Sequence, residues 1–187
     1  MTTKETSISS LILLLLTLAM ACAQVSASER AGSATAAFER LSTLVGTWRF
    51  TAPSGKHQSV AYRLTAGGST LVETWTLGSG RESMTLYHLD GSDLIATHYC
   101  PQGNQPRLVL KPAGDATLLS FEFKDGTNLQ APGASHQHHF WLRFDSADTY
   151  TRSETYVPNG SSESAAAQAE AGAAITYERV TAALPSR

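Results

Sequence analysis

The sequence predicts an all-β protein, built as a single antiparallel up-and-down β-barrel of about ten strands with a short helix before it. Apolar and polar residues alternate in short segments from Thr47 onward, which is typical of strands with one buried face. Gly, Pro, Asn and Asp separate these segments, and no long helical pattern lies between them to suggest a parallel α/β sheet. Closing such a sheet into a barrel removes its exposed edges.

The N-terminus has the pattern of an export signal. Lys4 precedes an apolar run from Leu11 to Ala21, which is shorter than the ~20 residues that cross a bilayer. Ala21-Cys22-Ala23 fits the A-x-A cleavage pattern. We therefore expect residues 1–23 to be a signal peptide and the protein to be periplasmic or secreted.

Cys22 supports an alternative to simple cleavage. The segment Leu18-Ala19-Met20-Ala21-Cys22 resembles a permissive bacterial lipobox, in which the signal ends at residue 21 and the cysteine is lipidated. A lipid anchor at Cys22 is the one membrane attachment that the sequence suggests. Under both interpretations Cys100 is left without an internal disulfide partner.

A helix is expected just before the barrel. Residues 24–34 are small and polar, which predicts a flexible arm, and residues 35–187 are expected to form the barrel domain. Within Thr35 to Leu44, the apolar residues Phe38, Leu41 and Leu44 recur at helical spacing. Val45-Gly46 ends this short amphipathic helix.

The ten predicted strands follow one another as a meander. They are Thr47–Ala52, Gln58–Ala66, Thr70–Leu77, Ser83–Asp90, Leu94–Cys100, Pro106–Lys111, Thr117–Lys124, His136–Asp145, Thr149–Val157 and Ala173–Val180. Asp90-Gly91 is a strong hairpin signal between the fourth and fifth strands. Residues 158–172 are biased toward Ser, Glu and Ala, which predicts a solvated low-complexity insertion; its centre, 164–171, is compatible with one or two helical turns.

One residue pair supports closure of the barrel. Trp48 lies in the first strand and Arg179 in the last, and these strands are neighbours in a closed barrel. A guanidinium stacked on the indole would seal one end with about 0.5–2 kcal/mol of cation–π energy. The formal net charge is only −2 and no basic stripe is present, so no nucleic-acid partner is expected.

These features resemble the lipocalin and fatty-acid-binding superfamily, which combines a short helix, a Gly-x-Trp motif and an arginine on the last strand. Leu41-x-x-Leu44-x-Gly46-x-Trp48, Met84 to Gly91, and Thr97-His98-Tyr99-Cys100 with Gly103-Asn104-Gln105-Pro106 are similar to a group of bacterial lipocalin-like proteins of unknown function. The similarity covers most of residues 38–157, and the insertion at 158–172 departs from it. It implies the barrel fold, and no established activity.

A histidine-rich strand offers possible metal ligands. On a regular strand His136 and His138 share a face with Phe140, so we expect both to face the barrel interior. Two such imidazoles could hold a metal ion or haem, with His98 or Cys100 as the third ligand. The alternative is that the histidines hydrogen-bond one another or solvent near the rim.

The stretch Thr97 to Arg107 is the densest in reactive side chains. Tyr99, Asn104, Gln105 and Arg107 are candidate ligand-binding residues at the cavity rim, and Arg107 is suited to a carboxylate or phosphate. The alternative is that the carboxamides only shape the turn. Arg152 either binds an anionic group in the same way or pairs with Glu154 or Glu73.

The sequence thus predicts a non-catalytic barrel that binds a small, partly apolar molecule for carriage, sequestration or sensing. The ligand's polar part would contact His98, Tyr99, His136 and His138, beneath Asn104 and Gln105. Two alternatives stay open. One is the metal or haem site of His98, His136 and His138; the other is a hydrolase or isomerase in which His98 activates Cys100.

Overall fold

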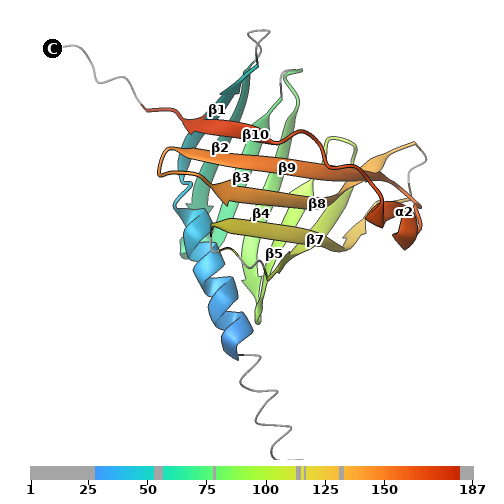
Figure 1. Cartoon of the computed structure of the whole chain (residues 1–187), viewed down its shortest axis with the longest axis horizontal. Helices are drawn as coiled ribbons and strands as arrows, with labels where there is room; N and C mark the ends of the chain where they lie inside the picture. Colours follow the sequence, from blue (N-terminus) through green and yellow to red (C-terminus); the bar gives the residue numbers. More distant parts are fainter. Residues whose placement is uncertain are drawn as a thin grey trace, which may run out of the picture.

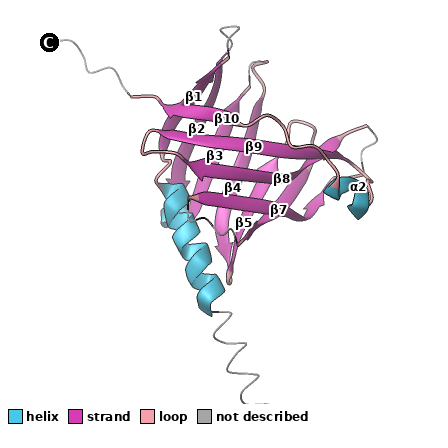
Figure 2. Cartoon of the chain, viewed as in Figure 1, coloured by secondary structure: helices cyan, strands magenta, loops and turns pink. Residues whose placement is uncertain are grey.

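A closed antiparallel barrel forms the body of the protein (Figures 1 and 2). The computed structural model describes residues 28–52, 57–77, 79–112, 115, 117–130 and 133–181. Within these residues each strand pairs with its neighbours in the chain, and β1 closes the barrel on β10. The strands are β1 Gly46–Thr51, β2 His57–Thr65, β3 Thr70–Thr76, β4 Glu82–Asp90, β5 Asp93–Tyr99, β6 Gln105–Lys111, β7 Leu118–Thr127, β8 Ser135–Phe144, β9 Thr149–Pro158 and β10 Ile175–Arg179. The ten-stranded barrel predicted from the sequence is confirmed.

The two ends of the barrel differ. Because the strands alternate in direction, the short turns at 66–69, 91–92 and 145–148 lie at one end, which we call the closed end. The connections at 77–81, 100–104 and 159–174 lie at the other, which we call the open end. In Figure 1 the strands β7 to β10 form the near wall and β2 to β5 cross behind it.

The N-terminal helix packs on the closed end. It spans residues 28–42, so it starts before the predicted Thr35 and includes part of the predicted arm. Ala34, Ala37 and Leu41 lie on one face at helical spacing and are buried in the barrel core. Residues 1–27, which hold the predicted signal and Cys22, lie outside the described residues. No helix within the described part of the chain is long and apolar enough to span a membrane.

Arg179 and Trp48 join the last strand to the first, as the sequence predicts. Their backbones are paired in the β1–β10 register, and the Arg179 guanidinium carbon lies 4.2 Å from the centre of the Trp48 ring. The same guanidinium donates to the carbonyl oxygens of Val45 and Thr43, each at 3.0 Å. One side chain therefore links both terminal strands to the end of the helix.

The Gly-x-Trp motif has a steric reason in this arrangement. Gly46 has a φ of +131°, which L side chains rarely adopt. A Cβ built on it would lie 3.0 Å from Nη1 of Arg179. Trp48 is in turn fixed because its indole Nε1 donates to the Leu44 carbonyl at 2.7 Å.

The insertion between β9 and β10 is partly structured. It contains a short helix, α2 (Glu163–Ala167), whose residue Ala166 is buried. After α2 the chain returns to β9, where the Gly172 N–H donates to the Glu154 carbonyl at 2.8 Å. The Ser153 hydroxyl donates to the Gly172 carbonyl at 2.7 Å. Part of the segment predicted to be solvated therefore covers β9.

The closing contact predicts a stability change. Arg179→Ala removes the cation–π contact, the bonds to the carbonyl groups of Thr43, Val45 and Ala147, and the ion pair with Asp148, so the free energy of unfolding should fall by about 2 kcal/mol. Arg179→Lys should recover only part of this, because an ammonium lacks the planar fork. Urea unfolding measures both. Arg63→Ala, at an exposed position of β2, is the control, and an equally small effect at Arg179 would contradict the role of the contact.

Candidate functional site

A cavity of about 350 Å³ opens at the open end of the barrel. Trp75, Tyr156 and Tyr177 supply aromatic surface, and Leu77 and Ile175 add aliphatic surface. The polar side chains that reach it include Gln58, Ser83, His98, Arg152 and Glu154. Apolar walls with a few convergent polar groups are the usual composition of a small-molecule site.

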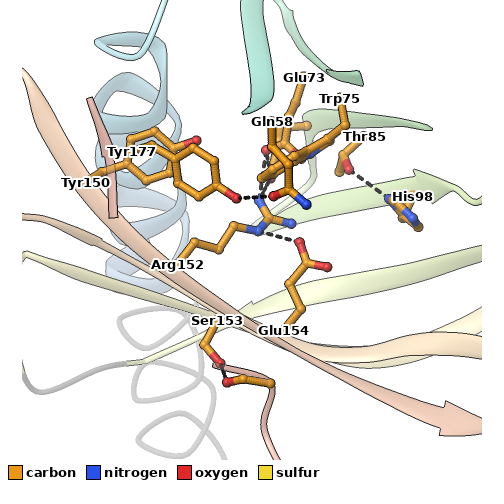
Figure 3. A network of polar contacts seen from close by, with 12 residues as sticks. Gln58, Glu73, Trp75, Thr85, His98, Tyr150, Arg152, Ser153, Glu154 and Tyr177 are labelled. Carbon is orange, nitrogen blue, oxygen red and sulfur yellow. Dashed lines mark hydrogen bonds and ion pairs between the residues drawn. The ribbon is translucent and has the colours of Figure 1, made fainter. Parts of the chain in front are cut away.

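Arg152 lies on the cavity floor (Figure 3). Its side chain is 2% exposed, and its Nη1 donates to Oε2 of the fully buried Glu73 at 2.9 Å. Its Nε donates to Oε1 of Glu154 at 2.8 Å. The guanidinium also stacks over the rings of Phe140, at 4.2 Å, and Trp75, at 5.2 Å. Strands β3, β8 and β9 thus hold one cation.

Glu73 is the charged partner of this arginine. Burial alone raises a carboxyl pKa, but Arg152 and the hydrogen bonds from Trp75 and Tyr87 outweigh it and hold the pKa of Glu73 below its usual value. The Trp75 indole N–H donates to Oε1, and the Tyr87 hydroxyl donates to Oε2 at 2.7 Å. Burial, helped by the same carboxylate, raises the pKa of Tyr87, which remains a neutral donor.

His98 lines the cavity beside this network and is 3% exposed. Its Nδ1 lies 3.1 Å from the Thr85 hydroxyl, and its Nε2 is buried with no hydrogen-bond partner among the described residues. Arg152 Nη2 is likewise buried and unpartnered within them. Figure 3 shows both side chains facing the same space, with Glu154 beside them. Burial lowers the pKa of His98, so its neutral form is favoured.

The upper wall is formed by tyrosines. Tyr177 stacks on Tyr150 with ring centres 5.2 Å apart and meets Trp75 edge-on at 5.4 Å. Its hydroxyl donates to Oε1 of Gln58 at 3.1 Å. These contacts fix the position of the aromatic surface.

His136 and His138 do not face this cavity, contrary to the sequence prediction. A β-bulge between Gln137 and His139 adds one residue to β8 and inverts its alternation. Gln137 pairs with the cavity-lining Tyr156, whereas His136 pairs with Val157. Residues paired across antiparallel strands share a face, so Gln137 points inward and His136 outward.

The histidines line a second cavity, of about 690 Å³, between β7, β8 and the α2 segment. His136 Nε2 lies 3.3 Å from His138 Nδ1, and His136 Nδ1 lies 3.0 Å from Oδ1 of Asn159. Phe123 packs against both rings. His98 is not part of this cluster, so the predicted triad of His98, His136 and His138 is not assembled. Among the described residues no group of three His, Cys, Asp or Glu side chains could hold a metal ion.

The rim candidates also face outward or bond locally. Arg107 forms a bidentate ion pair with Asp125, at 2.5 Å to each oxygen, on the outer surface. Tyr99 is 44% exposed and lies near this pair, in a shallow depression outside the barrel. Neither side chain lines the interior cavity, so their predicted place at its rim is wrong.

The carboxamides near them organise the 100–104 loop. Asn104 donates to the Ser135 carbonyl at 2.9 Å. Gln105 donates to the Gly103 carbonyl and accepts from Thr127. These bonds fit the turn-shaping alternative, whereas the buried Oδ1 of Asn104 has no hydrogen-bond partner among the described residues.

The hypothetical Cys100–His98 couple is not assembled either. Cys100 is a half-buried free thiol, and the Nδ1 of His98 is bonded to Thr85 rather than to the sulfur. Asn104, the residue available to orient the couple, is turned toward Ser135.

The sequence points to His98 but gives a weaker indication of the charged pair of β9. Arg152 and Glu154 are two apart and share a face with the fully buried Tyr150, which is a local signal for inward-facing charges. Glu73 occupies the same kind of position between Leu71 and Trp75. Three charged residues at interior positions indicate a polar centre, although the pairing among them is not readable from spacing.

The comparisons with known proteins do not identify a family for this chain. No protein family matches the sequence, and no curated protein does. The structure is similar to the crystal structure of Rv2717c from M. tuberculosis, with a TM-score of 0.48 and 17% identity, over 78% of this chain and 98% of that chain. This similarity assigns no family. The resemblance to lipocalin-like proteins stays a prediction, whereas the barrel is observed.

The buried ion pair predicts a strongly non-additive mutant cycle. Arg152→Met leaves the Glu73 carboxylate buried without its counter-charge and should cost about 3–5 kcal/mol of unfolding free energy. Adding Glu73→Gln removes that uncompensated charge, so the double variant should lose less than the sum of the single variants. Arg143→Met, at an exposed pair with Asp145, should cost under about 1 kcal/mol. Additive losses in urea unfolding would contradict the coupling.

His98 predicts a pH dependence of stability. Its pKa in the folded protein lies below the usual 6.5, so the unfolded chain takes up a proton first as the pH falls. The contribution of neutral His98 to the free energy of unfolding is therefore fully present above about pH 6.5. It is lost as the pH falls toward the pKa of His98 in the folded protein. Thermal unfolding between pH 8 and pH 5.5 should show a shallower decline in His98→Gln than in wild type.

The stability of His98→Gln at pH 8 serves as the internal reference, because His98 is neutral there in both the folded and the unfolded chain. The decline of thermal stability below pH 8, compared between wild type and His98→Gln, then reports the protonation of His98. His138 and His139 also have lowered pKa values and keep part of the slope in the variant. An unchanged slope in His98→Gln would rule out this role for His98.

Proposed function

We propose that this protein is an exported, non-catalytic barrel that binds a small, partly apolar molecule in the cavity at its open end. The supporting observation is that two residues lining that cavity, Arg152 and His98, each hold a deeply buried nitrogen, Nη2 and Nε2, without a partner in the described part of the chain. Leaving a buried polar group unsatisfied costs about 1–3 kcal/mol, so a site that does so twice favours a molecule that supplies the missing bonds.

The shape of the site supports binding rather than a structural role. A volume of about 350 Å³ lies in the range of small-molecule sites. Trp75 and Tyr177 present rigid aromatic surface above the polar floor. The closed end, by contrast, is filled by Trp48, Leu41 and Leu44.

Export is part of the proposal and rests on the N-terminal sequence alone. The short apolar run before Ala21-Cys22-Ala23 supports cleavage, with lipidation at Cys22 as the alternative. An intact mass of the mature protein distinguishes them. A protein outside the cytoplasm with such a cavity would carry, sequester or sense its ligand.

Native mass spectrometry of protein purified from its own host tests the function directly. We expect a bound mass that dissociates on denaturation. Ser83→Phe places a ring in the cavity, because Ser83 is buried and lines it, and should abolish both this mass and binding of the uncharged fluorophore prodan. Ala61→Phe, at an exposed position of β2, is the matched control. Equal loading of wild type and Ser83→Phe would refute interior binding.

A further inference from the structure

We propose that the ligand is uncharged and presents a carbonyl-type acceptor beside an O–H or N–H donor, on an aromatic or alicyclic body. This inference rests on the proposed function and specifies its ligand class. It follows from the donors, the acceptors and the formal charges around the cavity floor.

The acceptor requirement comes from Arg152. Its Nε donates to Glu154 and its Nη1 donates to Glu73. Its Nη2 has no hydrogen-bond partner among the described residues. An arginine nitrogen can only donate. The ligand must therefore place an acceptor oxygen or nitrogen at Nη2.

His98 adds a second unpartnered group. The Thr85 hydroxyl is buried and lies within hydrogen-bond distance of Nδ1 of His98. When the hydroxyl donates to Nδ1, the neutral ring carries its proton on Nε2, which then needs an acceptor; when Nδ1 donates to the hydroxyl, Nε2 needs a donor. A ligand with an acceptor beside a donor satisfies Nε2 in either tautomer.

The formal charge of the floor argues against an anion. Arg152 supplies one positive charge, Glu73 and Glu154 supply two negative charges, and His98 is neutral. A carboxylate ligand at Nη2 would lie beside the Glu154 carboxylate, in a site partly withdrawn from water. Like charges at short range are strongly unfavourable there, so a neutral carbonyl fits better than a fatty-acid head group.

Glu154 also sets the donor requirement. Its side chain is 28% exposed and lines the cavity, and Arg152 is bonded to one of its oxygens, Oε1. The carboxylate can accept further bonds, which a ligand O–H or N–H can fill. The aromatic wall of Trp75 and Tyr177 suits a flat body rather than a flexible chain.

Three probes of one shape test the class: 2-naphthamide, 2-naphthoate and 2-(aminomethyl)naphthalene, titrated calorimetrically at pH 7.5. The amide should bind at least about tenfold more tightly than the carboxylate or the ammonium. In Glu154→Gln the like charge is removed, so the carboxylate should gain about tenfold, whereas the amide should show no such gain because its N–H exchanges a carboxylate acceptor for the Gln carbonyl. Glu163→Gln, at an exposed residue of α2 outside this cavity, should leave all three unchanged.

The outcomes separate the two proposals. Carboxylate or ammonium binding as tight as the amide overturns the ligand class and leaves interior binding standing. If none of the three probes binds but protein from the host still carries a bound mass, the ligand class is again overturned and interior binding stands. Failure of all three with no bound mass overturns both. A Glu154→Gln variant that keeps its circular dichroism spectrum but shows no gain for the carboxylate overturns the charge argument.

Discussion

The buried guanidinium of Arg152 is the group on which the barrel interior depends. Removing a cation from water costs several kcal/mol, and this cost is offset by Glu73, Glu154 and two aromatic faces at once. Each partner comes from a different position on the sheet: Glu73 from β3, Phe140 from β8 and Glu154 from β9 itself. The charge is therefore satisfied only when the barrel is closed in this register.

The need to satisfy the buried charge of Arg152 divides the barrel interior into two parts. Below Arg152 the side chains are apolar or aromatic and pack against the N-terminal helix, with Trp48, Leu41 and Phe121 almost fully buried. Above Arg152 the interior is polar. Filling this part with apolar side chains would leave Arg152 Nη2 and His98 Nε2 buried without any hydrogen-bond partner. A cavity bounded by aromatic walls is the arrangement that leaves those groups available to a ligand.

The strands and the Trp48–Arg179 closure were predictable because alternation and turn residues are local signals. The histidine placement was not. The bulge adds one residue to β8, and no glycine or proline in the sequence indicates it. A shift of one residue is enough to turn His136 from the interior to the outer face. Arg107, by contrast, follows the ordinary alternation of its strand, since Pro106 and Leu108 on either side of it are buried and it points outward. The Arg152–Glu73 contact joins residues 79 apart, which only the strand register specifies.

The connection between β9 and β10 joins the wall of the cavity to its charged floor. Gly172, Ala173 and Ile175 line the cavity, and the backbone N–H of Gly172 is bonded to the carbonyl of Glu154. A Cβ at position 172 would lie 2.9 Å from that carbonyl oxygen, so the close approach requires glycine. The chain segment that borders the cavity is therefore fixed to the backbone of the residue whose carboxylate holds Arg152.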